Sequence, residues 1–337
     1  MNRQATAAGA VIIAAILIVA AGWYLAGPGK NTAGPLEPVT VAYSPFESSG
    51  LFLVAVDQHF FEQNGLNLTL YRSSSGAAAL DDMLNGKADM AVSVSEYPLV
   101  SKVFQGTTAR ALASMDKAEY IYIVARKDRG IVNASDLKGK RIGTSTGSIA
   151  GFYLGRFLTL NGMGIGDVRT VNIATPGETA DAVVDGDLDA AVLAQPYADQ
   201  ARDLLGANAT SWPAQSSQPL FALVVSTEEW IAGHPDQASR FLRALAEAEA
   251  YTNAHPAGAG AIIQRELNFD PAYMDTVRQQ NQFGLSLDQS LVLAMEDESR
   301  WMIANNLTNA TAVPDFGKYI YPDALNAVKP GSVNVIG

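Results

Sequence analysis

The chain has 337 residues, of which 48% are hydrophobic and 17% are charged, and it contains no cysteine. This composition excludes a disordered chain, a disulfide framework, a thiolate zinc site and a cysteine nucleophile. The formal net charge of −11 argues against a broad nucleic-acid-binding face, because phosphate backbones require a basic surface. Small anionic ligands are not excluded, since backbone amides can hold them without lysine or arginine.

The first predicted element is the apolar segment Ala7–Ala26, which lies in a stretch without charged residues between Arg3 and Lys30. Twenty helical residues span about 30 Å, the thickness of a hydrocarbon core. A cleaved signal peptide is the alternative, but the length of the apolar run favours a transmembrane anchor within residues 1–29. Residues 30–38 form a short linker, and the rest of the chain is expected outside the cytoplasm, at the cell surface or in the periplasm.

The remaining chain contains an internal repeat. The segment Leu80–Tyr97 aligns without a gap with Ala180–Tyr197, at an offset of 100 residues. Each copy predicts a helix, a glycine C-cap, an aspartate turn, a buried strand and a loop. A strand, a loop of small residues and a helix precede each copy, at Val39–Phe61 and at Arg141–Leu160. The repeated βαβ pattern predicts an α/β protein with two lobes, each a mostly parallel sheet flanked by helices.

The order of these units predicts how the lobes divide. Residues 39–125 form the first part of lobe 1, residues 126–219 form lobe 2, and residues 220–337 return to lobe 1. The last segment is expected to add helices but no strands, so it cannot form an α/β domain of its own. Both connections between the lobes are then extended segments, which favours a two-segment hinge.

The ordered motifs resemble a known family of transport proteins. They are VAYSPF, SSSGAAALDDMLNGKADMAV, DLKGKRIGTSTGS and ETADAVVDGDLDAAVLAQPYAD. The chain resembles the substrate-binding proteins of ABC importers of the nitrate, sulfonate and taurine type, which are related to the binders of thiamine pyrimidine precursors. The resemblance covers roughly Val39–Ala304 and implies a type II periplasmic-binding-protein fold. It also implies a receptor that closes on a small solute and delivers it to a permease.

Candidate ligand-binding residues follow the predicted strands, because ligands of such sheets bind outside the strand carboxyl ends. In lobe 1, Phe46 could stack on a flat or alkyl ligand. The amides and hydroxyls that open the helix after Arg72 could hold an anion, and N-capping by Ser75 is the equally weighted alternative. The lobe 1 candidates are Ser44, Pro45, Phe46, Ser74, Ser75, Gly76, Ser95 and Glu96.

Glu96 supports two interpretations. In a cleft, its carboxylate would favour a ligand with an amine or ring N–H donor. A solvated loop acid is the alternative, and the pattern favours it slightly.

In lobe 2, a run of small hydrogen-bonding residues precedes a predicted helix and exceeds what a cap requires. Glu178 fits a capping box with Thr175, and that structural role is favoured over ligand contact. Gln195 and Tyr197 occupy the positions that echo Ser95 and Tyr97. The lobe 2 candidates are Ser145, Thr146, Gly147, Ser148, Glu178, Gln195 and Tyr197.

No catalytic residue, metal ligand or cofactor is predicted. The three histidines do not form a metal-binding pattern, and Glu296–Glu298 is expected on a solvated helix face. The predicted partners are a small polar or anionic organic solute, such as a sulfonate, taurine-like or pyrimidine-like molecule, together with an ABC permease and its ATPase. The membrane anchor, a monomeric state and no nucleic acid complete this prediction. The alternatives are a pyrimidine-precursor biosynthetic enzyme of the same fold and a membrane-tethered sensor.

Overall fold

The computed structural model describes residues 35–145, 148–173, 175–271 and 273–335. The chain divides into two units, Met1–Leu36 and Glu37–Gly337, and the description below concerns the second. The predicted N-terminal anchor lies outside the described residues. Within the described ranges, no helix combines the length and the apolar character needed to cross a bilayer.

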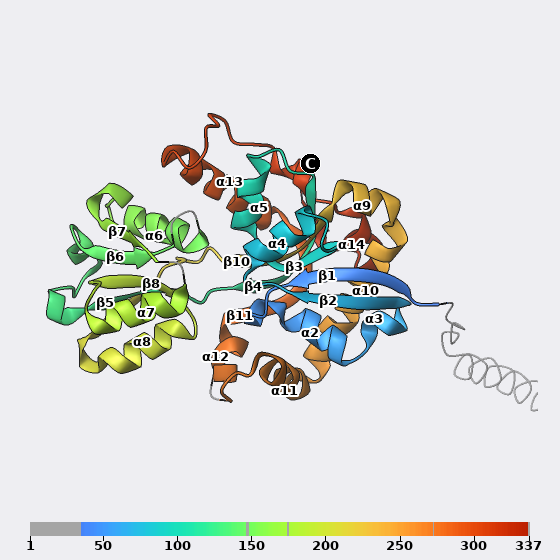
Figure 1. The fold of residues 1–337 in the computed structure, drawn as a ribbon, viewed down its shortest axis with the longest axis horizontal. Coiled ribbons are helices and arrows are strands. Elements are labelled where there is room, and N and C mark those ends of the chain that lie inside the picture. The colour runs from blue at the N-terminus through green and yellow to red at the C-terminus, as the bar shows by residue number, and fades with distance from the viewer. Residues whose placement is uncertain (1–34, 146–147, 174, 272, 336–337) are drawn as a thin grey trace, which may run out of the picture. The chain divides into compact units, whose positions relative to one another are not determined.

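The larger of two sheets has seven strands and mixed direction (Figure 1). Strand β1 pairs in parallel with β2 and β3, whereas β10 runs antiparallel to both β3 and β4, and β11 runs antiparallel to β4. In spatial order the strands are β12 (Val333–Asn334), β11 (Asn281–Asp288), β4 (Ala109–Ala118), β10 (Leu220–Thr227), β3 (Met90–Ser95), β1 (Glu37–Tyr43) and β2 (Leu66–Arg72).

The smaller sheet has five strands and is also mixed. Strand β6 pairs in parallel with β7 and β8, and β5 runs antiparallel to β8 and β9. In spatial order the strands are β7 (Arg169–Asn172), β6 (Arg141–Thr144), β8 (Ala190–Ala194), β5 (Ile121–Arg126) and β9 (Ala209–Pro213). The prediction of mostly parallel sheets is therefore wrong. The segments that cross between the sheets enter each one as strands of opposite direction, and a βαβ pattern in the sequence does not reveal them.

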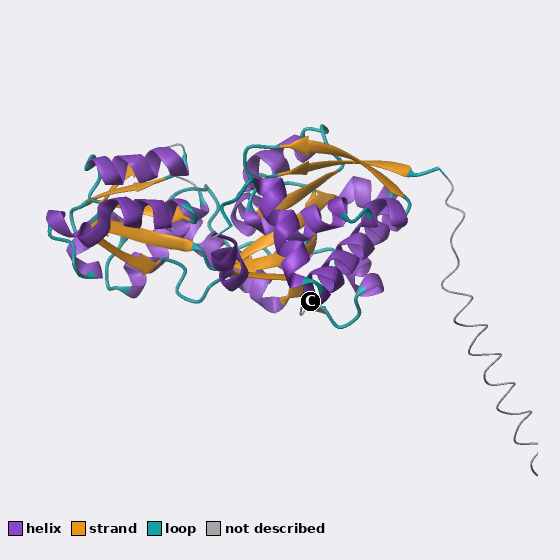
Figure 2. Cartoon of the chain, turned by 90° about the horizontal axis from the view of Figure 1, so that it is seen from below, coloured by secondary structure: helices purple, strands orange, loops and turns teal. Residues whose placement is uncertain are grey.

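Helices flank the strands of both sheets (Figure 2). The larger sheet carries α2 (Gly50–Asp57), α3 (Phe60–Gln63), α4 (Gly76–Leu84), α5 (Glu96–Val103), α9 (Glu228–Gly233), α10 (Pro235–Ala254), α11 (Pro256–Leu267), α12 (Tyr273–Gln280), α13 (Gln289–Ala304) and α14 (Asp323–Val328). The smaller sheet carries α6 (Ile149–Leu160), α7 (Pro176–Asp185) and α8 (Tyr197–Leu205). Short 3-10 turns are η1 (Glu47–Ser49), η2 (Lys127–Arg129), η3 (Ala134–Leu137), η4 (Ile165–Asp167), η5 (Gly206–Asn208) and η6 (Phe316–Tyr319).

The C-terminal segment contributes strands as well as helices, which corrects the expectation of helices alone. Strand β11 pairs with β4, and the short β12 pairs with β11, so the segment extends the seven-stranded sheet. The sequence of β11, NQFGLSLD, contains polar residues and a glycine. Such a composition does not indicate a strand unless a neighbouring strand supplies the pairing partner.

The internal repeat is present in the structure. In one copy α4, β3 and α5 follow each other, and in the other α7, β8 and α8 do so. The aspartate turns are equivalent: Asp89 accepts a hydrogen bond from the backbone of Thr40 at 2.7 Å, and Asp189 accepts one from the backbone of Arg141 at 2.8 Å. Gly86 and Gly186 follow the ends of the helices before these turns, and their positive φ angles of 73° and 88° suit glycine.

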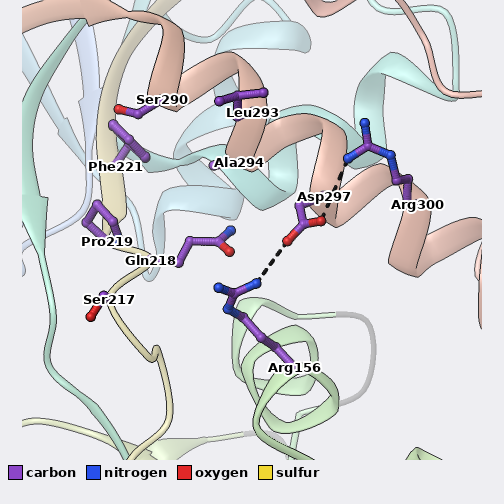
Figure 3. Close-up of a pocket in the computed structure, with 10 residues that line it drawn as sticks. All are labelled: Arg156, Ser217, Gln218, Pro219, Phe221, Ser290, Leu293, Ala294, Asp297 and Arg300. Carbon is purple, nitrogen blue, oxygen red and sulfur yellow. Dashed lines mark hydrogen bonds and ion pairs between the residues drawn. The ribbon is translucent and has the colours of Figure 1, made fainter. Parts of the chain in front are cut away.

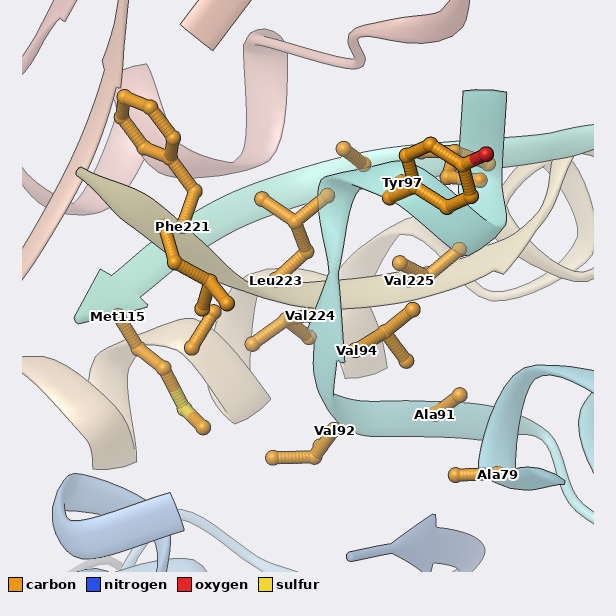
Figure 4. Close-up of a cluster of buried hydrophobic side chains, with 14 of the residues drawn as sticks. Ala79, Ala91, Val92, Val94, Tyr97, Met115, Phe221, Leu223, Val224 and Val225 are labelled. Carbon is orange, nitrogen blue, oxygen red and sulfur yellow. The ribbon is translucent and has the colours of Figure 1, made fainter. Parts of the chain in front are cut away.

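The hydrophobic core of the larger sheet is centred on β3, β10 and β4 (Figure 4). Val92, Val94, Leu223 and Val224 are at most 5% exposed, as expected for strands covered on both faces. Strand β10 carries a continuous apolar run because both of its faces are buried, whereas β3 and β4 also include polar residues. The core therefore holds the carboxyl end of β3 in a fixed position.

Two segments carry the chain between the sheets, at residues 119–120 and 214–219. The buried Gln215 joins them: its Oε1 accepts hydrogen bonds from the backbone of Tyr120 at 2.7 Å and of Ile121 at 2.9 Å. Its Nε2 donates to Ala118 O at 2.8 Å. The predicted domain boundaries, after residues 125 and 219, remain predictions. Strand β5, which spans the first of these boundaries, lies in the smaller sheet.

Candidate ligand-binding site

The parallel strands β1, β2 and β3 end at one edge of the larger sheet, and a serine cluster lies there. Ser44 Oγ donates to Ser93 O at 3.0 Å, and the hydroxyls of Ser48 and Ser93 are 2.5 Å apart. Ser93 has a φ of +61° at a β-bulge between β3 and β10. A non-glycine residue in this region is strained, and such bulges are common beside binding sites. Ser48 and Ser93 were not among the sequence candidates, because Ser93 reads as an ordinary strand residue.

The loop after β1 offers one free aromatic ring. Phe46 is 41% exposed, whereas Ser44 beside it is fully buried and Pro45 is half-buried. Of these three predicted residues, Phe46 is therefore the one with an accessible side chain. Ser44 instead fixes the loop to β3.

The helix α4 begins beside the serine cluster. Ser75 Oγ accepts from Ala78 N at 3.1 Å, so the capping interpretation of Ser75 is observed. Ser74 is exposed, and the side chain of Ser73 donates to Asp82 at 2.8 Å. A Cβ on Gly76 would lie 2.5 Å from Ser93 O, so glycine is required for close packing. Whether the free amides of this helix also hold a ligand stays a prediction.

The corresponding loop of the smaller sheet follows β6. Ser148 Oγ donates to Ser145 O at 2.6 Å and accepts, at 3.5 Å, from Gly151 N in the first turn of α6. Both residues are half-buried. Thr146 and Gly147 lie outside the described residues, so the predicted ligand contact by this loop remains untested.

The other candidates in the smaller sheet are used for local structure. Thr175 and Glu178 form a cap, with Thr175 Oγ1 donating to Glu178 Oε2 at 2.9 Å and accepting from Glu178 N at 3.3 Å. The favoured structural role of Glu178 is thus observed. Gln195 precedes a cis peptide bond and its side chain accepts from Asp199 N at 3.1 Å. Tyr197 opens α8 and is half-buried.

Glu96 is fully buried at the first position of α5, so the solvated-loop interpretation of Glu96 is wrong. Its Oε2 accepts from Phe221 N, on β10, at 3.0 Å. Ser95, just before it, is half-buried and makes no cap hydrogen bond. Glu298 is also fully buried, which corrects the expectation that Glu296–Glu298 lies on a solvated face. Residues 96 and 298 look like surface acids in sequence, because only the packing of α5 against α13 buries them.

A second group of buried acids lies next to the serine cluster. Glu47, on η1, is 2% exposed and accepts from Tyr273 Oη at 3.4 Å. Burial raises the pKa of Glu47 to about 7. Asp116, on β4, is 1% exposed, and burial raises its pKa well above the usual value. The sequence gives no signal that would single out either residue.

A pocket of about 320 Å³ lies between α6, α13 and the crossing segment 217–219 (Figure 3). Arg156 donates to Asp297 Oδ2 at 3.0 Å across it, and Arg300 lies 3.7 Å from the other oxygen of Asp297. Leu293 and Phe221 contribute apolar surface. None of the predicted ligand-binding residues that the structure describes lines this pocket.

The described residues contain no cluster of histidine and acidic side chains that could hold a metal ion. His59 lies near Glu62, and His234 and His255 stack on Trp230 and Tyr251. The geometry therefore offers hydroxyls, backbone amides, the exposed aromatic ring of Phe46 and buried carboxyls. These groups suit the recognition of a small polar molecule.

The model of the NMT1/THI5-like family matches residues 47–259 of the chain. The chain belongs to this family. The match covers Ser48 and Ser93 of the serine cluster, the whole smaller sheet and the return strand β10, and it confirms the resemblance that the sequence motifs predicted.

Three individual proteins illustrate what the chain is similar to. The chain is 25% identical to a putative aliphatic sulfonates-binding protein of Bacillus subtilis over 275 residues, 78% of the chain and 80% of that protein. It is 24% identical to 4-amino-5-hydroxymethyl-2-methylpyrimidine phosphate synthase of Aspergillus parasiticus over 220 residues, 61% of the chain and 63% of the synthase. The alkanesulfonate-binding protein SsuA of Xanthomonas axonopodis pv. citri, solved with MOPS, has a TM-score of 0.72 at 17% identity, covering 86% of the chain and 100% of SsuA. The fold is that of a periplasmic binding protein with mixed sheets.

Proposed function

We propose that this chain is the extracytoplasmic solute receptor of an ABC importer. It takes a small polar or anionic organic molecule, sulfonate-like, taurine-like or pyrimidine-like, between the strand ends of its two sheets. The observation that supports this proposal most is the serine cluster at the carboxyl ends of β1–β3. The chain also has a relative that is named as a sulfonate-binding protein. Neutral hydroxyls and amides then hold the ligand, and the exposed ring of Phe46 packs on its flat or alkyl part.

The proposal includes a membrane anchor and a hinge. Residues 7–26 tether the receptor beside its permease and the permease's ATPase, and the segments joined by Gln215 let the two halves of a type II fold close on the solute. The receptor acts as a monomer. Fractionation of cells tests the anchor: the full chain should sediment with membranes, and recovery in the soluble fraction would contradict the anchor alone.

A thermal-shift screen tests ligand binding by the full chain in mild detergent. The probes are taurine, ethanesulfonate, MOPS, nitrate, a hydroxymethylpyrimidine and small carboxylates. A ligand at about a hundredfold excess over its Kd stabilises the folded state by about 2.7 kcal/mol, which raises the Tm by several degrees. No shift with any probe would count against the receptor function.

Paired variants test the position of the site. Removing both hydroxyls in Ser145→Ala/Thr146→Ala should weaken binding of a hit by about 5- to 150-fold, because each neutral hydrogen bond contributes about 0.5–1.5 kcal/mol. Ser74→Ala is expected to act in the same direction. Ser135→Ala, an exposed serine on η3, is the matched control and should leave the Kd unchanged. If the control and the site variants change the Kd equally, the binding site lies elsewhere.

A biosynthetic enzyme is the rival function, because one relative is named as a pyrimidine phosphate synthase. The chain lacks cysteine throughout, so any chemistry that needs a thiol would have to come from another group. Incubation of a hit compound with the chain, followed by mass spectrometry, distinguishes the two functions. Unchanged recovery of the compound supports a receptor, and conversion supports an enzyme.

A further inference from the structure

Two glutamates meet in the core between α5 and α13. Glu96 and Glu298 are each 0% exposed, and they lie on helices that pack against each other. Glu96 directly follows β3, and Glu298 lies in the third turn of α13. The mechanism of ligand binding described above uses neither carboxyl group.

The hydrogen bonding of this pair is incomplete unless it holds a proton. Glu96 Oε2 accepts from Phe221 N, but Glu96 Oε1 and both carboxylate oxygens of Glu298 have no N–H or O–H donor in the described part of the chain. The two carboxyl groups interact with each other. A single proton between them supplies the missing donor and removes one of two buried negative charges.

The groups around the pair favour the protonated form. Asp297 on α13 raises the pKa of Glu298 further. Tyr97 on α5, Tyr153 on α6 and Tyr120 in the crossing segment also lie near the pair, and burial together with the nearby negative charges raises their own pKa values. On β4, Lys117 already pairs with Asp288 and lies over the ring of Phe221. Burial, the largest cause, raises the pKa of Glu96 to about 7 and that of Glu298 well above its usual value.

The pair lies one turn from the contact between α13 and the smaller sheet's helix α6. Trp301 packs edge-on against Phe152, with ring centroids 5.8 Å apart, and a Cβ on Gly155 would meet its indole nitrogen at 2.3 Å. Asp297, next to Glu298, pairs with Arg156 of α6 at 3.0 Å. Movement of α13 would therefore change how α6 is held.

We propose that Glu96 and Glu298 share one proton that fastens α13 to the start of β10, and that loss of this proton loosens the hold of α13 on α6. The arrangement of the two halves then depends on the external pH. At low pH the pair holds at least one proton, and α13 stays packed against α5. At high pH two buried carboxylates repel each other, and α13 shifts away from α5.

Distance measurement between spin labels tests this proposal without any ligand. Because the chain has no cysteine, Leu204→Cys on α8 and Glu229→Cys on α9 place one label on each half. In the otherwise unchanged full chain in detergent, the distance distribution should differ between about pH 5.5 and about pH 8.5. In Glu298→Gln, which keeps a hydrogen-bond donor but cannot ionise, the difference should disappear.

Two further variants make the result decisive. Glu96→Gln should also remove the pH difference, and it replaces Glu298→Gln if that variant does not fold. Glu47→Gln removes another buried acid, on η1, and should retain the difference. The proposal is overturned if the labelled parent shows no pH difference, or if both pair variants keep it. A failed ligand screen with an intact pH response would instead refute only the receptor function.

Equilibrium unfolding gives an independent measure. Between about pH 5.5 and about pH 8.5, the unfolding equilibrium constant of the parent should increase by at least about tenfold more than that of Glu298→Gln, since each unit of raised pKa is a tenfold factor. Equal increases in the two proteins would show that the pair does not titrate in this range and would overturn the proposal.

Discussion

At the scale of single residues, the candidate site depends on where one backbone passes close to another. Gly76 opens α4 directly against Ser93 O, and Ser93 occupies a left-handed bulge that places its hydroxyl against Ser48. A side chain at position 76 would have to push the helix away from β3. The serine cluster and the start of α4 are therefore one packed unit, and a change in either should disturb the other.

Gly76→Ala tests this packing. The added Cβ would meet backbone at 2.5 Å, so we expect a loss of about 1–3 kcal/mol in the free energy of unfolding, measured by urea titration. Gly166→Ala is the control, because a Cβ added there would meet nothing within 4 Å and the φ of Gly166 is not positive. A loss in the control as large as that of Gly76→Ala would contradict the packing argument.

At the scale of elements, the two repeats use the same turn to tie a helix and a strand to their neighbour. Asp89 and Asp189 each accept a hydrogen bond from the first part of the adjacent parallel strand, and their backbone amides donate to the same strand in return. The reciprocal pair fixes the register of β1 against β3 and of β6 against β8. Register in turn determines which residues reach the edge where the ligand is proposed to bind.

Asp89→Ala and Asp189→Ala test the role of these turns. Each removes a charge-assisted acceptor from a backbone N–H, which should cost about 1–3 kcal/mol of folding free energy. Asp185→Ala, at the exposed end of α7, is expected to change stability by less than about 0.5 kcal/mol. If the two turn variants are as stable as this control in thermal or urea unfolding, the turns do not set the register.

At the scale of the whole molecule, buried acids couple folding to pH. Glu47, Asp116, Glu96 and Glu298 all have pKa values raised by burial, so the folded state binds protons that the unfolded chain releases. A raised pKa means that the contribution to stability is complete below the unfolded pKa of about 4.3. It is then lost as the pH rises through the folded pKa, which is about 7 for Glu47 and Glu96.

We therefore expect the folded chain to be less stable at about pH 8 than at about pH 5. A rise of about two units in one carboxyl pKa corresponds to at most about 3 kcal/mol. Urea unfolding across this range measures the difference, and Glu47→Gln should reduce its size by removing one of the titrating groups. A stability that rises steadily from about pH 5 to about pH 8 would contradict the burial of these acids in solution.

Local signals in the sequence were sufficient for the repeated elements and their caps. Ser75 and Thr175 precede helices and cap them, because an N-cap needs only a side-chain oxygen and the next few residues. The order of the βαβ units, and with it the family, follows from such local patterns. Strand β11 and the antiparallel crossings were missed, because their pairing partners are distant in sequence.

The sequence by itself determined the repeated α/β units, the capping residues, the lack of thiol chemistry and the family. Only the tertiary structure decided that Ser48 and Ser93 join Ser44, that Gln215 connects the two crossing segments, and that Glu96 and Glu298 are buried together. The physical reason is distance along the chain. Hydrophobic period and capping act over a few residues, whereas the burial and pKa of a carboxyl depend on which helix packs over it. For Glu96 that helix is α13, which comes from the C-terminal part of the chain.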